Sequence, residues 1–392
     1  MRKIPKLRRL MTLLALLLAL TGFAVSGNAV PPLMTTLSKE MGTDISAFGY
    51  ILSLQFSFFF LAALAGGWAG ERFGIKPGIF AAAGLTMMTV CLFIVPLLNK
   101  FYLFALWSVP LGFAGGLTET FSTIMITRYD REGSGKILNL SQGFFTFGAV
   151  AAPWIISGIL ERGISWRTAF LIFGGILTVI TSLFIISTNP FARKRMAGAG
   201  EKPAPPEPFQ WDKHLLLFSG ALFFYVTVES AAVAWISAYF EESLGTSAGN
   251  AAWRLSVFWG GLLVSRLGMM IVPDRFTLWP AMIIGAAGMS ICFILFAPVS
   301  SPIIATILTG TVGFCAGPLW PSTVTAASQH LRSSRKTTIV IGAGALGVAA
   351  GPFTGSLIIK TSGLKTIFPV FGTVSVFLLI IYLTLYFRRN RT

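Results

Sequence analysis

Two carboxylic acids lie inside long apolar stretches of this sequence, where an ionised group is costly. Glu119 stands in the segment Gly-Leu-Thr-Glu-Thr-Phe-Ser-Thr, and Glu229 stands in Tyr-Val-Thr-Val-Glu-Ser. Neither acid has a Lys or Arg within one helical turn of its own segment. A carboxyl group surrounded by hydrocarbon favours its neutral form, so each acid can hold a proton and release it when water enters. The alternative for each is a permanently neutral acid that hydrogen-bonds a neighbouring helix.

Amide and aromatic side chains in other apolar stretches are suited to bind a small polar solute beside these acids. Asn139, Gln142 and Thr146 are three and four residues apart, which places them on one helix face that can bind hydroxyl groups. Asn139 has a second interpretation as a solvated residue at a helix start. Aromatic side chains offer a flat apolar face to a sugar ring, and their alternative role is packing against lipid or helices. The further binding candidates are Asn28, Tyr225, Trp154, Trp235, Trp259 and Trp320.

The composition shows which elements must position these residues. Of 392 residues, 54% are apolar and 11% are charged, against about 25% charged in a soluble domain. Apolar runs recur that are long enough to cross a bilayer as helices. The first run follows a basic segment and imitates a signal peptide, but we expect a first membrane helix. The sequence predicts an all-α membrane protein with twelve spans, at about 10–34, 45–71, 77–97, 101–127, 137–160, 167–187, 213–240, 250–271, 276–297, 302–328, 336–359 and 365–387.

Charge divides the chain and orients it. The polar segment from Asn189 to Asp212 has the composition of a linker, so we expect a six-helix half at 1–188, a linker at 189–212 and a second half at 213–392. The net charge is +16, and the 30 basic residues divide 23 to 7 in favour of the side that holds the linker and both termini. The positive-inside rule then places this side in the cytoplasm, with the protein in the plasma (cell inner) membrane. Because the basic residues are spread over several loops, we expect no nucleic-acid partner.

The predicted halves repeat each other in glycine and arginine patterns. Gly67-Trp68-Ala69-Gly70-Glu71-Arg72-Phe73-Gly74-Ile75-Lys76 follows the second span, and Gly261 through Arg266-Leu267-Gly268 ends the eighth. Helices 3, 6, 9 and 12 of the prediction lack internal amides or acids, so these four should face lipid. The pattern resembles the major facilitator superfamily, which implies the major facilitator fold and a loop that latches the cytoplasmic helix ends. The departures are Glu71 in place of Asp and Ile75 in place of a basic residue. The expected gating residues are Gly67, Glu71, Arg72, Gly74, Lys76 and Arg266.

Further segments are similar to one branch of that superfamily, the fucose/galactose/glucose:proton symporters. They include Glu119-Thr120, Leu138 to Ala149, Tyr225 to Ile236, Phe258 to Gly261 and Gly317 to Pro321. The resemblance implies that Glu119 takes part in sugar recognition and proton coupling, and that Gln142 lies in the sugar cavity. Fucose permeases also use an acid on the first helix, where this chain has Gly27 or Asn28. The proton would then be carried by Glu119 or Glu229.

The expected function is transport of a monosaccharide or similar small polar solute by proton symport and alternating access. A proton antiporter that exports drugs or metabolites is the alternative, and a non-transporting sensor or scaffold is a third possibility. We expect no enzyme activity and no cofactor beyond the proton gradient, because no Walker sequence or catalytic triad order occurs. We expect no metal, since Cys91, Cys292 and Cys315 lie in apolar runs and the two histidines form no ligand cluster. The expected partners are the solute, protons and the lipid bilayer, with the protein as a monomer.

Replacing Arg72 with Ala tests the gating interpretation. Arg72→Ala should slow the conformational cycle with little loss of equilibrium solute binding, because a latch between helix ends changes the rate of opening and not the solute contacts. Turnover and binding are measured separately on the purified variant. Full turnover in Arg72→Ala would leave this loop with a topological role only.

Overall fold

Every regular element in the computed structural model is a helix, within the residues that it describes: 6–127, 129, 136–190, 212–269, 271 and 278–388. The first part of the chain forms α1 (Lys6–Gly27), η1 (Pro31–Leu33), α2 (Met34–Met41), α3 (Ser46–Phe73), α4 (Pro77–Ile94), η2 (Val95–Leu97), α5 (Phe101–Thr127), α6 (Lys136–Glu161) and α7 (Arg167–Thr188). The second part forms α8 (Lys213–Ala238), η3 (Tyr239–Ser243), α9 (Ala248–Met269), α11 (Trp279–Leu295), α12 (Pro302–Ala316), α13 (Leu319–Leu331), α14 (Ser334–Ser362), η4 (Leu364–Thr366) and α15 (Ile367–Arg388).

Ten of the described helical stretches are long and apolar enough to cross a membrane, and α11 is a shorter apolar helix. The chain is therefore a multi-pass membrane protein. The eighth predicted span corresponds to α9, whose mean hydropathy is lower than that of the ten long stretches. Its sequence explains this, because it contains Asn250, Arg254 and Arg266.

Proline divides two of the predicted spans. The first was expected to run to about residue 34, but α1 ends at Gly27, and a short 3-10 turn at Pro31–Leu33 precedes α2. The tenth breaks between α12 and α13 at Gly317 and Pro318. Proline lacks the N–H that a continuous helix needs and crowds the preceding turn. Both breaks expose backbone carbonyls inside the protein.

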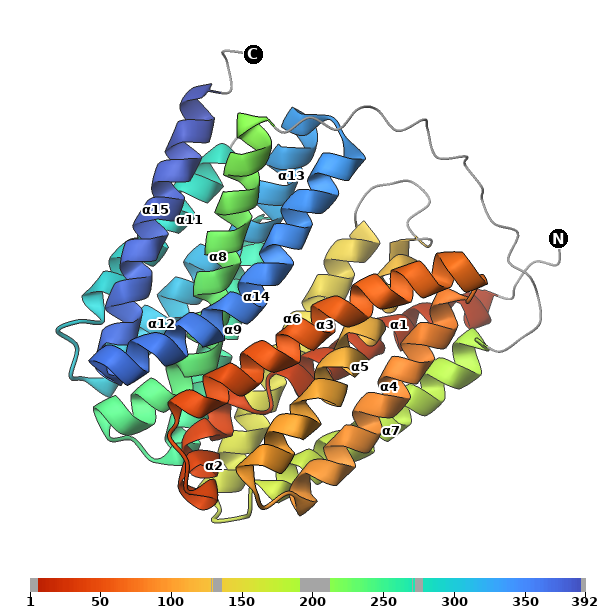
Figure 1. Ribbon diagram of the computed structural model, residues 1–392, viewed down its shortest axis with the longest axis horizontal. Helices are drawn as coiled ribbons and strands as arrows, with labels where there is room; N and C mark the ends of the chain where they lie inside the picture. Colours follow the sequence, from red (N-terminus) through yellow and green to blue (C-terminus); the bar gives the residue numbers. More distant parts are fainter. Residues whose placement is uncertain are drawn as a thin grey trace.

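The helices form two groups that meet along a limited surface (Figure 1). Helices α1 and α3–α7 pack against one another, as do α8 and α9 with α11–α15, while α3 packs on α14 and α6 packs on α9 between the groups. Across the groups, Ser53 Oγ donates to the Ala349 carbonyl at 2.6 Å, and Ser256 Oγ donates to the Val150 carbonyl at 2.7 Å. From these contacts the two groups diverge toward the end where α8 begins and α15 ends (Figure 1).

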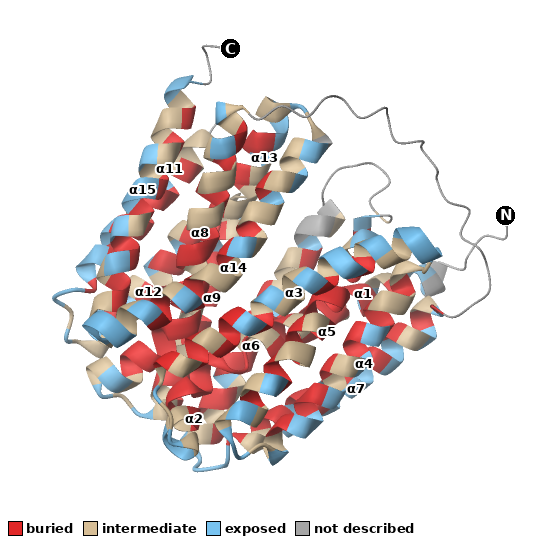
Figure 2. Ribbon diagram, in the orientation of Figure 1, coloured by how far each residue is buried: buried red, intermediate tan, exposed pale blue. Residues whose placement is uncertain are grey.

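Many residues on the outer faces of the groups are exposed (Figure 2), and large apolar side chains are among them. Large exposed side chains include Phe93 of α4, Val179 of α7, Ile291 of α11 and Phe377 of α15. These four helices are the ones predicted to face lipid, the third, sixth, ninth and twelfth spans. Lipid chains can cover such a surface at no cost, whereas water could not.

Glycines bring helix backbones together in the same way in both groups. A Cβ at Gly112 of α5 would overlap the Gln55 carbonyl of α3, and a Cβ at Gly313 of α12 would overlap the Phe258 carbonyl of α9. The two glycines begin similar segments of the sequence, Gly112-Phe113-Ala114-Gly115-Gly116 in α5 and Gly313-Phe314-Cys315-Ala316-Gly317 at the end of α12. Close approach without a side chain is thus the physical reason for the repeat.

A methyl group at Gly112 should destabilise the fold. Gly112→Ala forces α5 away from α3, and overpacking of this kind costs about 1–3 kcal/mol. The measurement is the thermal unfolding midpoint of the purified protein in detergent. Gly175→Ala in α7 is the control, because a Cβ there meets no atom within 4 Å. Equal midpoints for both variants would contradict the packing argument.

Candidate functional site

A small cavity lies inside the first helix group, between α1, α3, α4 and α5. Its volume is about 10 Å³, which is room for about one water molecule. Aromatic and small residues make most of its wall: Phe23, Ser26, Gly27, Gln55, Phe56, Phe59, Met88, Leu111, Gly112 and Gly115. The Oε1 atom of Gln55 is buried and has no hydrogen-bond partner among the described residues. The cavity therefore offers one hydrogen-bond acceptor in a largely apolar surround.

Glu119 lies one turn along α5 from this cavity. It follows Gly112 by seven residues and Gly115 by four, a spacing that puts all three on one face of the helix. Its side chain is half-buried, and no hydrogen bond or ion pair to it is found among the described residues. Burial without a partner makes an ionised carboxylate unfavourable in such a position.

A row of aromatic rings connects the cavity with the second helix group. Phe23 stacks on Phe59 with ring centroids 5.5 Å apart, Phe145 follows at 5.9 Å from Phe23, and Trp259 at 5.9 Å from Phe145. Gln142 precedes Phe145 by three residues and shares its face of α6. Asn139 was predicted for the same face, but its side chain lies outside the described residues. Sequence reasoning missed Phe23 and Phe145, because phenylalanine is too common here to stand out.

Asn28 and Trp259 bind each other across the two groups. The Trp259 indole Nε1 donates to Asn28 Oδ1 at 2.8 Å, and Asn28 Nδ2 donates to the Ala24 carbonyl at 2.8 Å. The Ala24 carbonyl also accepts the backbone N–H of Asn28 at 3.1 Å, so the side-chain amide adds a second hydrogen bond at the end of α1. Both side chains are buried, and the Asn28 amide and the Trp259 indole N–H are engaged with protein atoms.

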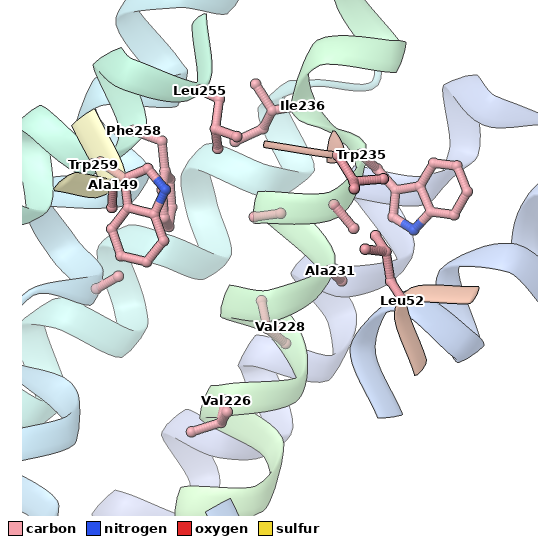
Figure 3. Close-up of a cluster of buried hydrophobic side chains, with 14 of the residues drawn as sticks. Leu52, Ala149, Val226, Val228, Ala231, Trp235, Ile236, Leu255, Phe258 and Trp259 are labelled. Carbon is pink, nitrogen blue, oxygen red and sulfur yellow. The ribbon is translucent and has the colours of Figure 1, made fainter. Parts of the chain in front are cut away.

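The other tryptophans lie in three different surroundings. Trp235 is buried between α8, α14 and α3, where Gly49 and Gly355 leave room for its ring. Figure 3 shows Leu52 of α3 beside Trp235 and Ala149 of α6 beside Trp259. Trp320 of α13 is half-buried against the apolar core. Trp154 of α6 is 68% exposed, and its place in a wall of the site stays a prediction.

Glu229 lies in a polar cluster at the break between α12 and α13. The Tyr225 hydroxyl donates to the Ala316 carbonyl at 3.1 Å, and Glu229 follows Tyr225 by one turn on the same face of α8. Arg266 of α9 donates from Nε to the Gly317 carbonyl at 3.3 Å, and its charge acts on Glu229. Tyr225 and Arg266 thus bind carbonyls at the end of α12, and the Gly317 carbonyl has no helical N–H partner because the residue four positions on is Pro321.

Arg266 is placed differently from the other expected gating residues. Gly67, Glu71, Arg72, Gly74 and Lys76 lie at the end of α3, where Gly74 closes the helix in the left-handed conformation at φ +65°. Glu71 and Arg72 are exposed and form no ion pair within the described part of the chain. Arg266 instead lies with Glu229 and Tyr225. The acid on α8 therefore has a cation nearby from another helix, which its own segment does not reveal.

A larger hollow, about 550 Å³, lies between α9 and α12. Its lining includes Val264, Ile307 and Phe314, which are among the exposed apolar residues. This hollow belongs to the lipid-facing surface. The residues that can bind a polar solute instead lie on α5, α6, α8 and α9.

Comparison with known proteins agrees with this architecture. The sequence model of the Major Facilitator Superfamily matches residues 12–341, and a second match covers residues 217–392. The chain belongs to the Major Facilitator Superfamily. A protein described as Protein TsgA homolog from Buchnera aphidicola (strain Tuc7) is 20% identical over 335 residues, which are 85% of this chain and 84% of that protein. The uncharacterized MFS-type transporter YfkL of Bacillus subtilis is 22% identical over 86% of this chain and 85% of its own length.

Two solved structures share the fold. A point mutant of the nucleoside transporter NupG superposes with a TM-score of 0.74 at 13% identity, over 96% of this chain and 100% of that one. A bacterial homologue of the human lysosomal transporter Spinster, in an inward-facing and occupied conformation, gives a TM-score of 0.76 at 14% identity, over 99% and 98% of the two chains. The protein is an MFS-type membrane transporter. The sugar:proton branch within the superfamily stays a prediction.

The hydrogen bond between Asn28 and Trp259 should be measurable as a coupling between the helix groups. In a double-mutant cycle, Asn28→Ala and Trp259→Phe should show a coupling of about 0.5–1.5 kcal/mol in the free energy of unfolding, the usual contribution of one hydrogen bond. The cycle is measured in detergent with the two single variants and the double variant. Strictly additive effects would mean that the bond contributes nothing to holding the groups together.

Proposed function

We propose that this protein is a proton-coupled secondary transporter that imports a monosaccharide or a similar small polar solute by alternating access. The observation that carries the proposal is Glu119, a half-buried carboxyl without a partner among the described residues, on the α5 face that lines the cavity. An acid of this kind can gain and lose a proton as water reaches it. Gln142 supplies hydroxyl-binding groups from α6, and the aromatic row supplies flat apolar faces.

We also propose that the chain forms twelve membrane spans in two halves. We count α9 and α11 as spans beside the ten longer stretches, which gives twelve, in halves at 1–188 and 213–392 joined by a linker at 189–212. The positive-inside rule puts the linker side in the cytoplasm of a plasma-membrane protein. The groups diverge on that side, and their contacts lie on the other, so the solute site would be reached from the cytoplasm in this conformation.

The coupling of proton and solute movement follows from where the charge of an ionised Glu119 is tolerated. A protonated Glu119 carries no charge, so the loaded site can be enclosed between the halves without burying an unpaired carboxylate on α5. When the cytoplasmic side opens, water stabilises the carboxylate and the proton leaves. The solute is then released because a neutral acid, which donates a hydrogen bond, becomes a carboxylate that only accepts. Glu229 is the second acid able to take this role.

Export by proton antiport is the second candidate. It is favoured by the aromatic wall of Phe23, Phe56 and Phe59, which would suit a bulky apolar solute. A non-transporting sensor is a third candidate, and flux of any solute in liposomes would argue against it. The three candidates differ in what moves across the membrane and in which direction relative to the proton gradient.

Replacing Glu119 with Gln should abolish pH-driven accumulation while sparing exchange of the solute. Glutamine keeps the shape and hydrogen-bonding groups but holds no exchangeable charge. Uptake of labelled hexoses and pentoses into proteoliposomes is measured with and without an inward proton gradient. Glu161→Gln, the same change at an exposed position on the far end of α6, is the matched control.

Accumulation of one sugar that is lost only in Glu119→Gln would support the proposal. Unchanged accumulation in this variant would remove Glu119 from proton coupling. Absence of sugar uptake, with proton release provoked by lipophilic amines, would favour the exporter.

A further inference from the structure

Arg266 lies on the face of α9 that is turned toward the other helix group. It follows Trp259 by seven residues, two helical turns, and Trp259 contacts Asn28 of α1 in that group. Residues seven apart on a helix share a face. Arg266 is therefore two turns nearer to the end where the groups diverge, on the side of α9 where a solute between the groups would lie.

The guanidinium of Arg266 is only partly engaged by the protein. Its Nε donates to the Gly317 carbonyl, and no further hydrogen bond or ion pair of its side chain is found in the described part of the chain. The two Nη groups, with four N–H donors, are thus available in a half-buried position. An arginine inside a membrane protein is costly, and its planar fork matches a carboxylate.

The neighbours of Arg266 limit the charge of what it can bind. Among the described residues, Arg266 is the only cation that acts on Glu229 and Tyr225. One guanidinium balances one negative charge, so a monoanion fits better than a phosphate ester with a charge of about −2. The Tyr225 hydroxyl and the Arg266 Nε–H already donate to the Ala316 and Gly317 carbonyls. The N–H groups that remain for a solute are those on the two Nη atoms of Arg266.

We propose that Arg266 binds the carboxylate of the transported solute, and that this solute is a sugar acid such as a hexuronate. This inference rests on the proposed function and names its substrate class. The carboxylate accepts two hydrogen bonds from the Nη groups, while the hydroxyl groups reach Gln142 and the ring lies against the aromatic row. Glu229 is neutral while the solute is bound, because two carboxylates beside one guanidinium would repel each other.

Uptake of labelled D-glucuronate and D-glucose by proteoliposomes tests the inference. The wild-type protein should show a KM for D-glucuronate that is about tenfold to a hundredfold below that for D-glucose, the range expected for a charge-assisted hydrogen-bonded pair. Arg266→Gln should lose this preference, and Arg266→Lys should keep part of it. Arg254→Gln is the matched control, because Arg254 stacks on Trp253 and Phe240 near the other end of α9.

A purely structural role for Arg266 predicts a different result. Without its bond to Gly317, Arg266→Gln would slow the uptake of both solutes by the same factor and leave the ratio of their KM values unchanged. That outcome overturns the inference. A thermal-shift titration in detergent provides a second readout: D-glucuronate should stabilise the wild type and Arg254→Gln but not Arg266→Gln.

The experiment separates the two proposals. Gradient-driven accumulation of D-glucose without uptake of D-glucuronate overturns the sugar-acid assignment and leaves sugar symport standing. Absence of accumulation for both solutes and for the hexose and pentose panel overturns sugar symport, and the assignment of Arg266 falls with it.

Discussion

The cost of an unpaired polar group in hydrocarbon is the constraint on which this structure depends. Backbone N–H and C=O groups inside a membrane have no water to bind, so a helix must satisfy them itself or find a partner. At the break between α12 and α13, polar side chains supply such partners, because Tyr225 and Arg266 donate to the Ala316 and Gly317 carbonyls. At the end of α1, the Asn28 amide donates a second hydrogen bond to the Ala24 carbonyl. Several polar residues of the candidate site therefore also bind the backbone at helix ends.

The contact between the helix groups uses the same chemistry. Ser53, Ser256 and Ser356 each donate a hydroxyl to a backbone carbonyl of the opposite group. Such bonds are short in reach and few in number, and a hydroxyl can turn back to a carbonyl of its own helix. Lys39 adds an ion pair with Glu241 and Glu242 across the same boundary, where water screens it. An interface built from exchangeable bonds can open without stranding a buried charge, which alternating access requires.

The two groups bring different chemistry to the space between them. The first contributes an unpaired carboxyl, an amide and a row of aromatic rings, none of which carries a permanent charge. The second contributes a cation, an acid and a phenol within reach of one another. Repeated glycines give both groups the same close backbone contact, at Gly112 in the first and Gly313 in the second, while the side chains around them differ. In the proposed mechanism, this difference lets one half bind the neutral part of the solute and the other its charged part.

The sequence by itself determined the membrane class, the helical architecture and the approximate position of most spans. Each of these follows from the composition of a single segment, because the hydropathy of one segment is enough to predict that it crosses the membrane as a helix. The glycine repeat was visible for the same reason, although its cause, the overlap with the Gln55 and Phe258 carbonyls, was not.

Only the tertiary structure decided which polar residues meet. Asn28 and Trp259 are 231 residues apart, and Arg266 reaches Glu229 from a different helix, so no spacing in the sequence predicts either pair. The same limit applies to Trp154, whose exposure on α6 cannot be read from its own segment. The direction in which a helix face points depends on how that helix is rotated against its neighbours. In this protein the rotation is set by close backbone contacts at glycines and by the helix breaks at prolines, and both act between segments that lie far apart in the chain.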